Sequence, residues 1–495
     1  MLTIGYDIGS SSIKASLYDV DSGEQVSHSS HPKAEMQIQS SKPGWAEQDP
    51  QSWWDAVKVV TAYLLRDSSR PPSEIAGIGI TYQMHGLVIV DRENRVLRPS
   101  IIWCDSRAVE IGDRAFKQVG EEKCLNFLLN SPGNFTASKL KWVIENEKSI
   151  FDRTFKFMLP GDYIAMKLTG EVTTTAEGLS EGVLWNFVED GPAEFMMEHL
   201  GIGADMLPEI VPTFGDQGKL SEAAASELGL KKGTPVTYRA GDQPNNAFSL
   251  NVLRSGEVAA TAGTSGVVYG VSDQVKFDRQ GRVNTFAHVN HSHSEKRLGI
   301  LLCINGTGIS YNWIRKMFFD SGLSYEKMNE SSENVRVGSD GLIFLPFGNG
   351  AERILGNRNP GASFAGLDFN KHTRKHLIRS VIEGVGFSFY YGMNILKELS
   401  VNSSVIRAGM ANMFLSSTFR ETISTLSGTC IQLYNTDSAL GAARGAAYGA
   451  GLYHSFEETF SGLRCLATVE PNLMRADSFS NAFDRWLVEL QKRLK

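Results

Sequence analysis

Gly5-Tyr-Asp-Ile-Gly-Ser-Ser-Ser-Ile-Lys14 begins the chain, and Ala260-Thr-Ala-Gly-Thr-Ser-Gly266 repeats its character near the middle. Each stretch predicts a short strand that ends in a turn of small and hydroxyl residues. Glycines let backbone N–H groups approach an anion closely, and serine and threonine hydroxyls add neutral donors around it. A hairpin turn is the alternative interpretation of either copy alone. Because the turn occurs twice, we expect two halves that hold one phosphate chain.

Length and composition indicate more than one globular domain. The chain has 495 residues, of which 42% are hydrophobic and 21% charged. A prior of roughly 150 residues per domain allows two to four domains, and the duplicated turn favours two. Lys231-Lys-Gly-Thr-Pro235 breaks helical structure and predicts a hinge between 235 and 256. We expect domains at 1–245 and 246–495, with a last helix that is free to pack back on the first.

Charge and cysteine content restrict the partners and the location. The net charge of −6 gives no electrostatic case for nucleic acid or an acidic membrane surface. No apolar run approaches roughly 18 residues, the length of a membrane span, and the first strand begins too near Met1 for a signal peptide. Five scattered cysteines favour a reduced compartment. We expect a cytoplasmic protein with small-molecule partners.

Hydrophobic periodicity predicts the same order of elements in both halves. The first half is expected to form strands at 2–7, 13–19, 24–30 and 77–81, with a helix at 51–67. The second half is expected to form strands at 257–262, 266–272, one ending near 289, and 298–304, then a helix at 310–319. Later α/β units comprise a strand at 404–408 and helices at 415–426 and 438–452.

Asp7 and Asp242 each follow a predicted strand, where a carboxylate is placed for chemistry. Beside a phosphate-binding turn, Asp7 would repel phosphates unless a divalent cation lies between them, so it predicts a Mg²⁺ site; a turn-initiating aspartate is the alternative. Asp242 precedes a helix with Pro244 in its first turn, and the helix N-terminus stabilises an ionised carboxylate. Such an aspartate accepts a hydroxyl proton, although a helix cap is the alternative.

Polar side chains after the strand at 77–81 are suited to a sugar. Gln83 and His85 offer hydrogen-bond donors and acceptors for sugar hydroxyls, and Met84 would fill space in the pocket. Trp103 and Asp105 would form an aromatic and polar wall of the same pocket. A structural histidine and a core tryptophan are the alternatives.

Two further segments remain ambiguous. Residues 408–412 and 437–443 are small enough to approach adenine, or to pack helices tightly. Glu352-Arg353 is a candidate for the sugar pocket, with a loop ion pair as the alternative.

In chain order, seven segments resemble the motifs of the FGGY carbohydrate kinases, and the resemblance covers nearly the whole chain. The segments are Gly5-Tyr-Asp-Ile-Gly-Ser-Ser, Gly44-Trp-Ala-Glu-Gln-Asp-Pro50, Gln83-Met-His-Gly86, Trp103-Cys-Asp-Ser-Arg107, Gly241-Asp-Gln243, Gly263-Thr-Ser-Gly266 and residues 408–443.

The resemblance implies an α/β fold of two ribonuclease H-like (actin-type) domains that flank a catalytic cleft. Asp242 resembles the general base and Asp7 the residue near Mg²⁺, bound directly or through water. The substrate-binding residues implied are Gln83, Met84, His85, Trp103, Asp105, Asp242 and Asn246. Those implied for ATP and its phosphates are Gly9, Ser10, Ser11, Ser12, Gly263, Thr264, Ser265, Gly409, Met410 and Asn412.

The activity implied is ATP-dependent phosphorylation of the 5-hydroxyl of D-xylulose, with ribulose or gluconate as alternative sugars. A non-sugar actin-like ATPase would share the duplicated turns. Tyr82 stands where the family often has a small residue, and Ala408-Gly-Met-Ala411 departs from the family's glycine-rich turn. The oligomeric state is left open, with a homodimer as one alternative.

Overall fold

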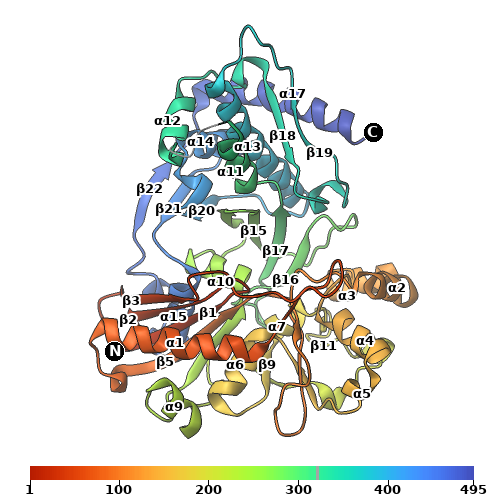
Figure 1. Cartoon of the computed structure of the whole chain (residues 1–495), viewed down its shortest axis with the longest axis vertical. Coiled ribbons are helices and arrows are strands. Elements are labelled where there is room, and N and C mark those ends of the chain that lie inside the picture. The colour runs from red at the N-terminus through yellow and green to blue at the C-terminus, as the bar shows by residue number, and fades with distance from the viewer. Residues whose placement is uncertain (319–322) are drawn as a thin grey trace. The chain divides into compact units, whose positions relative to one another are not determined.

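The computed structural model describes residues 1–318 and 323–495, which divide into two compact units (Figure 1). The first unit comprises 1–251, 286–297 and 436–463, and the second comprises 252–285, 298–435 and 464–495. The units are therefore interleaved along the chain. The division into domains at 1–245 and 246–495 stays a prediction.

The first unit is built on a five-stranded sheet of order β13-β5-β1-β2-β3. Strand β1 is antiparallel to β2 and parallel to β5, while β13 is parallel to β5 and β3 antiparallel to β2. The strands are β1 (Leu2–Ile8), β2 (Ile13–Asp19), β3 (Glu24–His31), β5 (Ile75–Tyr82) and β13 (Val236–Gly241).

Helices α1 (Pro50–Ser68) and α15 (Ser438–Gly449) pack on opposite faces of this sheet. Side chains alternate along a strand, so neighbouring residues of β1 face different helices. The Tyr6 hydroxyl lies 2.7 Å from the Thr61 hydroxyl of α1, whereas the Thr3 hydroxyl donates to the Ala443 carbonyl of α15 at 2.8 Å. Asp7, four residues after Thr3 on β1, lies on the same face of the sheet, which α15 covers.

Further elements complete the first unit. Its short strands are β4 (Glu47–Gln48), β6 (Val88–Val90), β7 (Ser100–Ile101), β8 (Lys156–Met158), β9 (Thr173–Thr175), β10 (Trp185–Asn186), β11 (Gly191–Pro192) and β12 (Glu209–Val211). Its other helices are α2 (Val109–Val119), α3 (Glu121–Leu128), α4 (Thr136–Asn146), α5 (Lys148–Phe151), α6 (Pro160–Thr169), α7 (Ala176–Glu181), α8 (Glu194–Leu200), α9 (Glu222–Leu228), α10 (Asp242–Ser249) and α16 (Phe456–Thr459).

The second unit contains a seven-stranded sheet of order β16-β17-β15-β14-β20-β21-β22. Strand β14 is antiparallel to β15 and parallel to β20, β15 is antiparallel to β17, and β20 is parallel to β21. The strands are β14 (Glu257–Ala262), β15 (Gly266–Ser272), β16 (Asn284–Ala287, whose last two residues belong to the first unit), β17 (Leu298–Ile304), β20 (Val405–Gly409), β21 (Ile431–Tyr434) and β22 (Cys465–Val469).

The two sheets share one topology. The order β3-β2-β1-β5-β13 in the first unit corresponds to β17-β15-β14-β20-β21 in the second, with the same two antiparallel and two parallel pairings. This is the duplicated ribonuclease H-like (actin-type) fold, so the expected fold class is confirmed.

The expected second-half strands at 257–262, 266–272 and 298–304 are confirmed, whereas the strand expected to end near 289 ends at Ala287. Helix α15 ends at Gly449 rather than at 452, because Gly451 takes a left-handed conformation with φ of 72°. The expected end of the helix at 310–319 lies outside the described residues.

The second unit packs its sheet against a helical core that includes α13 and α14. Sequence analysis left α17 free to return to the first domain; the helix lies in the second unit, where the Trp486 indole donates to the Phe344 carbonyl of β18 at 2.9 Å. The elements are α11 (Gly308–Phe318), α12 (Tyr325–Glu333), β18 (Ile343–Phe347), β19 (Gly361–Ala365), α13 (Arg374–Glu398), α14 (Ser417–Ser427) and α17 (Ala476–Arg493).

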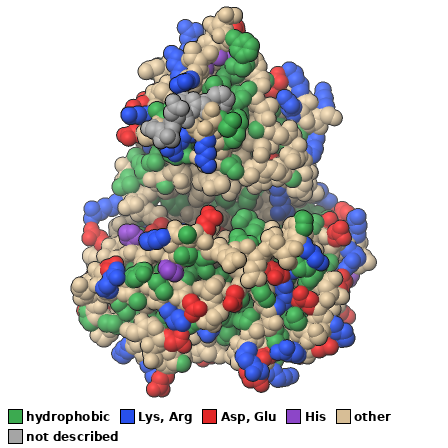
Figure 2. All heavy atoms as spheres, in the orientation of Figure 1, with side chains coloured by type: hydrophobic (Ala, Val, Ile, Leu, Met, Phe, Trp, Pro, Cys, Tyr) green, Lys and Arg blue, Asp and Glu red, His purple; other side chains and the backbone are tan. Residues whose placement is uncertain are grey.

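Surface charge agrees with the balanced composition. Figure 2 shows basic and acidic side chains interspersed on the visible face of each unit. None of the helices in the described ranges is long and apolar enough to cross a bilayer.

Close packing of α15 on β5 gives the first prediction. A Cβ on Gly79 would lie 2.1 Å from the Ala442 carbonyl oxygen, whereas one on Gly191 would meet no atom within 4 Å. We expect Gly79→Ala to lower the free energy of unfolding by about 1–3 kcal/mol, because overpacking forces backbone shifts. Gly191→Ala is the control and should change it by less than about 0.5 kcal/mol. Equal urea midpoints for the two variants would contradict this packing.

Candidate functional site

Three adjacent parallel strands bring the predicted residues of the first unit to one sheet edge. Asp7 lies near the end of β1, Gln83 follows β5, and Asp242 follows β13. The pairings Ile8 with Tyr82 and Tyr82 with Gly241 show that the three strand ends are in register. Carboxyl ends of parallel strands with this arrangement are the usual place for ligands in α/β proteins.

Asp7 lies in a buried, acidic environment. Its carboxylate pairs with Lys14 across the turn at 3.2 Å between Nζ and Oδ2. Burial raises the pKa of Asp7, Lys14 opposes that rise, and Asp437 adds to it. The charge of Asp7, and to a smaller extent the charges of Asp437 and Asp242, raise the pKa of Lys14. Three carboxylates therefore surround one lysine, which leaves an excess of negative charge suited to a cation.

Asp437 also lies at this site, although it was not among the residues predicted for it. Asp437 caps α15, where its carboxylate accepts the Leu440 N–H at 2.8 Å. An aspartate before Ser-Ala-Leu predicts a helix cap at residue 437. The position of Asp437 beside Asp7, however, depends on where α15 packs. The small residues of 437–443 allow α15 to pack closely on the sheet. On the other side of this contact, Gly5 and Gly79 leave no room for a side chain against α15.

Asp242 is the first residue of α10, directly after Gly241. Burial, followed by the charge of Asp7, raises the pKa of Asp242 to about 7. A general base is most effective when its pKa lies near the operating pH, so this carboxylate has the properties of a proton acceptor. Asn246 lies one turn further along α10, on the same side of the helix as Asp242.

Hydrogen bonds connect Gln83 to the first phosphate turn. The Gln83 amide nitrogen donates to Gln48 Oε1 at 3.3 Å, and the Gln48 amide nitrogen donates to the Ser10 carbonyl at 2.7 Å. The buried Oε1 of Gln83 has no hydrogen-bond partner among the described residues. Trp103, which is 54% exposed, donates from its indole to the Ser10 hydroxyl at 3.2 Å. An unpaired acceptor therefore lies beside the turn formed by residues 9–12.

The turn after Gln83 places Met84 and His85 beside Gly241, the last residue of β13, which directly precedes Asp242. Met84 is buried, and its Cγ lies 2.7 Å from where a Cβ on Gly241 would be. His85 adopts a left-handed backbone conformation with φ of 64°, and its ring packs at right angles to Phe135. Such conformations are strained for non-glycine residues and are frequent at functional sites.

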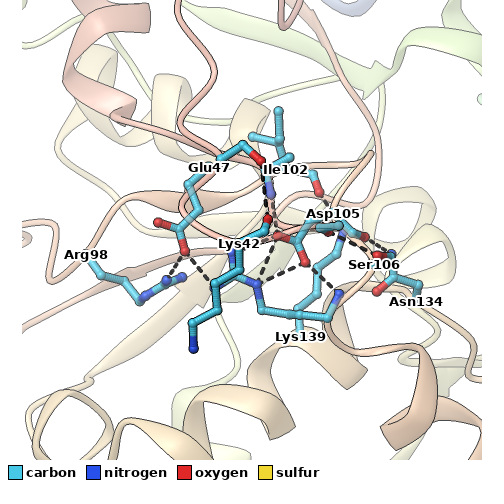
Figure 3. A network of polar contacts seen from close by, with 12 residues as sticks. Lys42, Glu47, Arg98, Ile102, Asp105, Ser106, Asn134 and Lys139 are labelled. Carbon is cyan, nitrogen blue, oxygen red and sulfur yellow. Dashed lines mark hydrogen bonds and ion pairs between the residues drawn. The ribbon is translucent and has the colours of Figure 1, made fainter.

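Asp105 is enclosed by protein donors (Figure 3). Its buried carboxylate accepts the Ala46 N–H at 2.6 Å and is paired with Arg107 at 2.7 Å. Arg107 also pairs with Glu47 at 2.6 Å. Lys139 lies beside this network and donates to the carbonyls of His85 and Ile102, at 2.8 and 3.0 Å. The geometry gives Asp105 a role in supporting the loops, while its predicted contact with a sugar stays a prediction.

The second phosphate turn lies against the start of α11. The Gly308 and Ile309 N–H groups donate to the carbonyls of Gly263 and Thr264 at 2.9 and 3.0 Å. Thr264 and Ser265 complete the turn before β15. Because a helix N-terminus carries partial positive charge, this arrangement is suited to phosphate. Sequence analysis had not identified the contribution of α11.

Residues 409–412 lie at the same edge of the second sheet. Strands β14 and β20 are parallel neighbours, so Gly409 and the turn at Gly263 are close. The Asn412 amide nitrogen lies 3.7 Å from where a Cβ on Gly263 would be. Met410 donates its N–H to the Tyr434 carbonyl at 2.9 Å. The predicted nucleotide residues of this unit therefore lie together.

Glu352 supports the loop before α11. Its buried carboxylate accepts the N–H groups of Asn305 and Gly306 at 3.0 and 3.1 Å. Arg353 instead donates to the Gly281 carbonyl at 2.7 Å. No ion pair joins Glu352 to Arg353 in the described structure, so their interpretation as a loop pair was wrong.

Asp7 fits a Mg²⁺ site in which the remaining ligands are substrate phosphates and water. The described ranges hold no group of three or more histidine, cysteine, aspartate or glutamate side chains arranged around a metal position. Mg²⁺ is commonly bound through one or two carboxylates together with substrate phosphates. Asp7, buried beside two further carboxylates, fits that pattern.

Cavity volume does not identify these residues. A cavity of about 560 Å³ is lined by Phe214, His291 and Tyr448, and another of about 280 Å³ by Ile309, Trp313 and Phe364. Asp7, Gln83 and Asp242 line neither, so strand ends and buried charge define the site.

Comparisons with known proteins agree on one kind of enzyme. Residues 2–249 match the family described as FGGY family of carbohydrate kinases, N-terminal domain. A xylulose kinase of Bacillus subtilis (strain 168) is 29% identical over 497 residues, which cover 97% of this chain and 95% of that protein.

Solved structures share the whole fold. The xylulose kinase from Rhodospirillum rubrum has a TM-score of 0.87 and 25% identity, over 99% of both chains. The gluconate kinase from Lactobacillus acidophilus has a TM-score of 0.88 and 24% identity, over 100% of this chain and 99% of that one. The second likeness concerns the fold alone.

The network around Asp105 gives a prediction about stability. We expect Asp105→Asn to lower the free energy of unfolding by about 3 kcal/mol, because it removes one of the two carboxylates that pair with the buried Arg107 and leaves only Glu47. Denaturant unfolding of the full chain measures this loss. Asp113→Asn, on the exposed face of α2, is the matched control and should unfold like the wild type. A stable Asp105→Asn protein whose sugar KM alone is raised would instead favour a direct substrate contact.

Proposed function

Because this chain belongs to the FGGY family of carbohydrate kinases, we propose that it transfers the γ-phosphoryl group of ATP to the 5-hydroxyl of D-xylulose. The chain is an ATP-dependent sugar kinase, and the choice of D-xylulose is supported by relatives named xylulose kinases. The observation that carries the proposal is the buried carboxylate of Asp242, which lies beside Asp7 at the strand ends that also present Gln83.

The first unit provides the acceptor side of the reaction. Asp242 accepts the proton of the sugar hydroxyl as its oxygen attacks the γ-phosphorus, and ADP leaves with the electrons of the broken P–O bond. The unpaired acceptor of Gln83 binds a sugar hydroxyl, and His85, Met84, Trp103 and Asn246 shape the remaining contacts. Phosphoryl transfer depends mainly on such positioning and on charge neutralisation.

The second unit provides most of the nucleotide side. Backbone N–H groups at residues 263–265 hold phosphate oxygens, the partial positive charge of the α11 N-terminus lies beside that turn, and residues 409–412 lie at adenine. Residues 9–12 hold the transferred phosphate from the first unit. When bound, Mg²⁺ neutralises charge on the phosphates, and Asp7 holds it directly or through water.

Other functions remain as alternatives to the substrate assignment. Ribulose and gluconate are the alternative sugars. A non-sugar actin-like ATPase would not need an acceptor site with a proton acceptor. Cytoplasmic location, a homodimer and the lack of nucleic-acid binding stay predictions.

The general base is tested by Asp242→Asn. We expect kcat for D-xylulose to fall about 10²- to 10⁴-fold, the usual contribution of a positioned proton acceptor, while ATP affinity is retained. Steady-state kinetics and calorimetric titration with an ATP analogue measure the two properties. Asp216→Asn, on an exposed loop, is the control. A variant with full sugar kinase activity would refute the assignment.

The pH dependence of kcat/KM provides a separate test. Asp242 must be ionised to accept a proton, and its pKa is raised to about 7. Activity should therefore be present above pH 7 and fall about tenfold for each pH unit below it. A rate profile that stays flat between about pH 5 and 8 would show that no group of this kind limits the reaction.

A further inference from the structure

Two buried carboxyl groups of α7 lie behind the acceptor residues. Glu177 and Glu181 are 1% and 0% exposed, and their spacing of four residues places them on one helix face. Sequence analysis gave neither residue a role. Neither forms an ion pair within the described part of the chain, although buried carboxyl groups are usually paired with a cation.

Glu181 contacts both segments that form the acceptor site. Its Oε1 accepts the His85 N–H at 3.4 Å, and its backbone carbonyl lies 3.0 Å from His85 Nδ1. Its Oε2 lies 2.7 Å from where a Cβ on Gly241 would be. One side chain therefore lies between the turn that carries Met84 and His85 and the strand end that presents Asp242.

Neighbouring contacts hold α7 itself in place. Glu177 Oε2 accepts the Gly241 N–H at 3.3 Å, and the Ser180 hydroxyl accepts the Ala287 N–H at 2.9 Å. The residue before Ala287, Phe286, packs its ring 5.4 Å from that of His85. Helix α7 thus supports the left-handed His85 from two directions, which fits a conformation that its surroundings must maintain.

Burial favours the protonated form of both carboxyl groups. Burial raises the pKa of Glu177 to about 8, and burial with the charge of Glu177 raises that of Glu181 well above its usual value. Glu181 Oε2 and the Tyr82 hydroxyl are both buried without a hydrogen-bond partner among the described residues. A protonated carboxyl both donates and accepts, so glutamine reproduces its size and hydrogen-bonding capacity.

We propose that Glu181 is a positioning residue for the phosphoryl acceptor, which fixes the Met84-His85 turn relative to Asp242 so that the sugar hydroxyl meets the base. Glu181 acts through its neighbours and does not touch the sugar. The inference rests on the proposed function, because it assumes that His85 contacts the sugar and that Asp242 accepts its proton.

Kinetics of full-length Glu181 variants test the proposal. We expect Glu181→Ala to raise the sugar KM and lower kcat/KM for the sugar about 10- to 100-fold, the cost of a small misplacement near the reacting atoms. The KM for ATP should stay within about twofold, and Glu181→Gln should restore kcat/KM to within about threefold of the wild type. The sugar is D-xylulose, or whichever alternative sugar substrate the wild type phosphorylates.

Two further variants separate positioning from stability. Glu181→Asp shortens the side chain by one methylene and should repeat the loss of sugar kcat/KM, even if Glu181→Ala does not fold. Glu383→Gln alters a buried carboxylate that pairs with Arg379 in the second unit at 2.7 Å, so it should lower thermal stability and leave the sugar KM unchanged.

The outcomes distinguish this inference from the proposed function. Sugar kinetics of Glu181→Asp within about twofold of the wild type would overturn the inference, as would equal losses in the Gln and Asp variants. If Asp242→Asn still loses activity in that case, the proposed function stands alone. A wild-type protein that phosphorylates no sugar would overturn both.

Discussion

Parallel pairing of β1, β5 and β13 is the constraint on which the acceptor site depends. The pairing brings Asp7, Gln83 and Asp242 to one edge, although they are far apart in the sequence. Close packing of α15 keeps these strands in place and adds Asp437 at the same edge. The second sheet repeats the topology, with the turn at 263–265 and residue 409 at the corresponding strand ends.

Buried negative charge gives this edge its chemistry. Asp7, Asp242 and Asp437 surround one lysine, so the site has an excess of carboxylates before any ligand binds. Burial and the charge of Asp7 raise the pKa of Asp242 to about 7, and burial also raises the pKa of Asp7, which Lys14 opposes. Behind them, burial raises the pKa of Glu181, whose carboxyl group accepts the His85 N–H.

Strand ends, turns and helix starts could be predicted from the sequence, because they depend on residues that are neighbours along the chain. Strand-to-turn patterns identified Asp7 and the turn at 263–265, and the helix start identified Asp242. Contacts made through long-range packing could not be predicted: Asp437 reaches the site because α15 returns to the first unit, and α11 approaches Gly263 from a distant segment. Glu177 and Glu181 have the spacing of a solvated helix face, which concealed their burial.

The central claim is that the described acceptor edge directs phosphate to the primary hydroxyl of a ketopentose. The most direct measurement is ³¹P and ¹H NMR of the product formed from D-xylulose and Mg-ATP by the wild-type protein. The account predicts stoichiometric ADP and a phosphate coupled to the C5 methylene protons. Release of inorganic phosphate without any sugar phosphate, or attachment at another carbon, would contradict it.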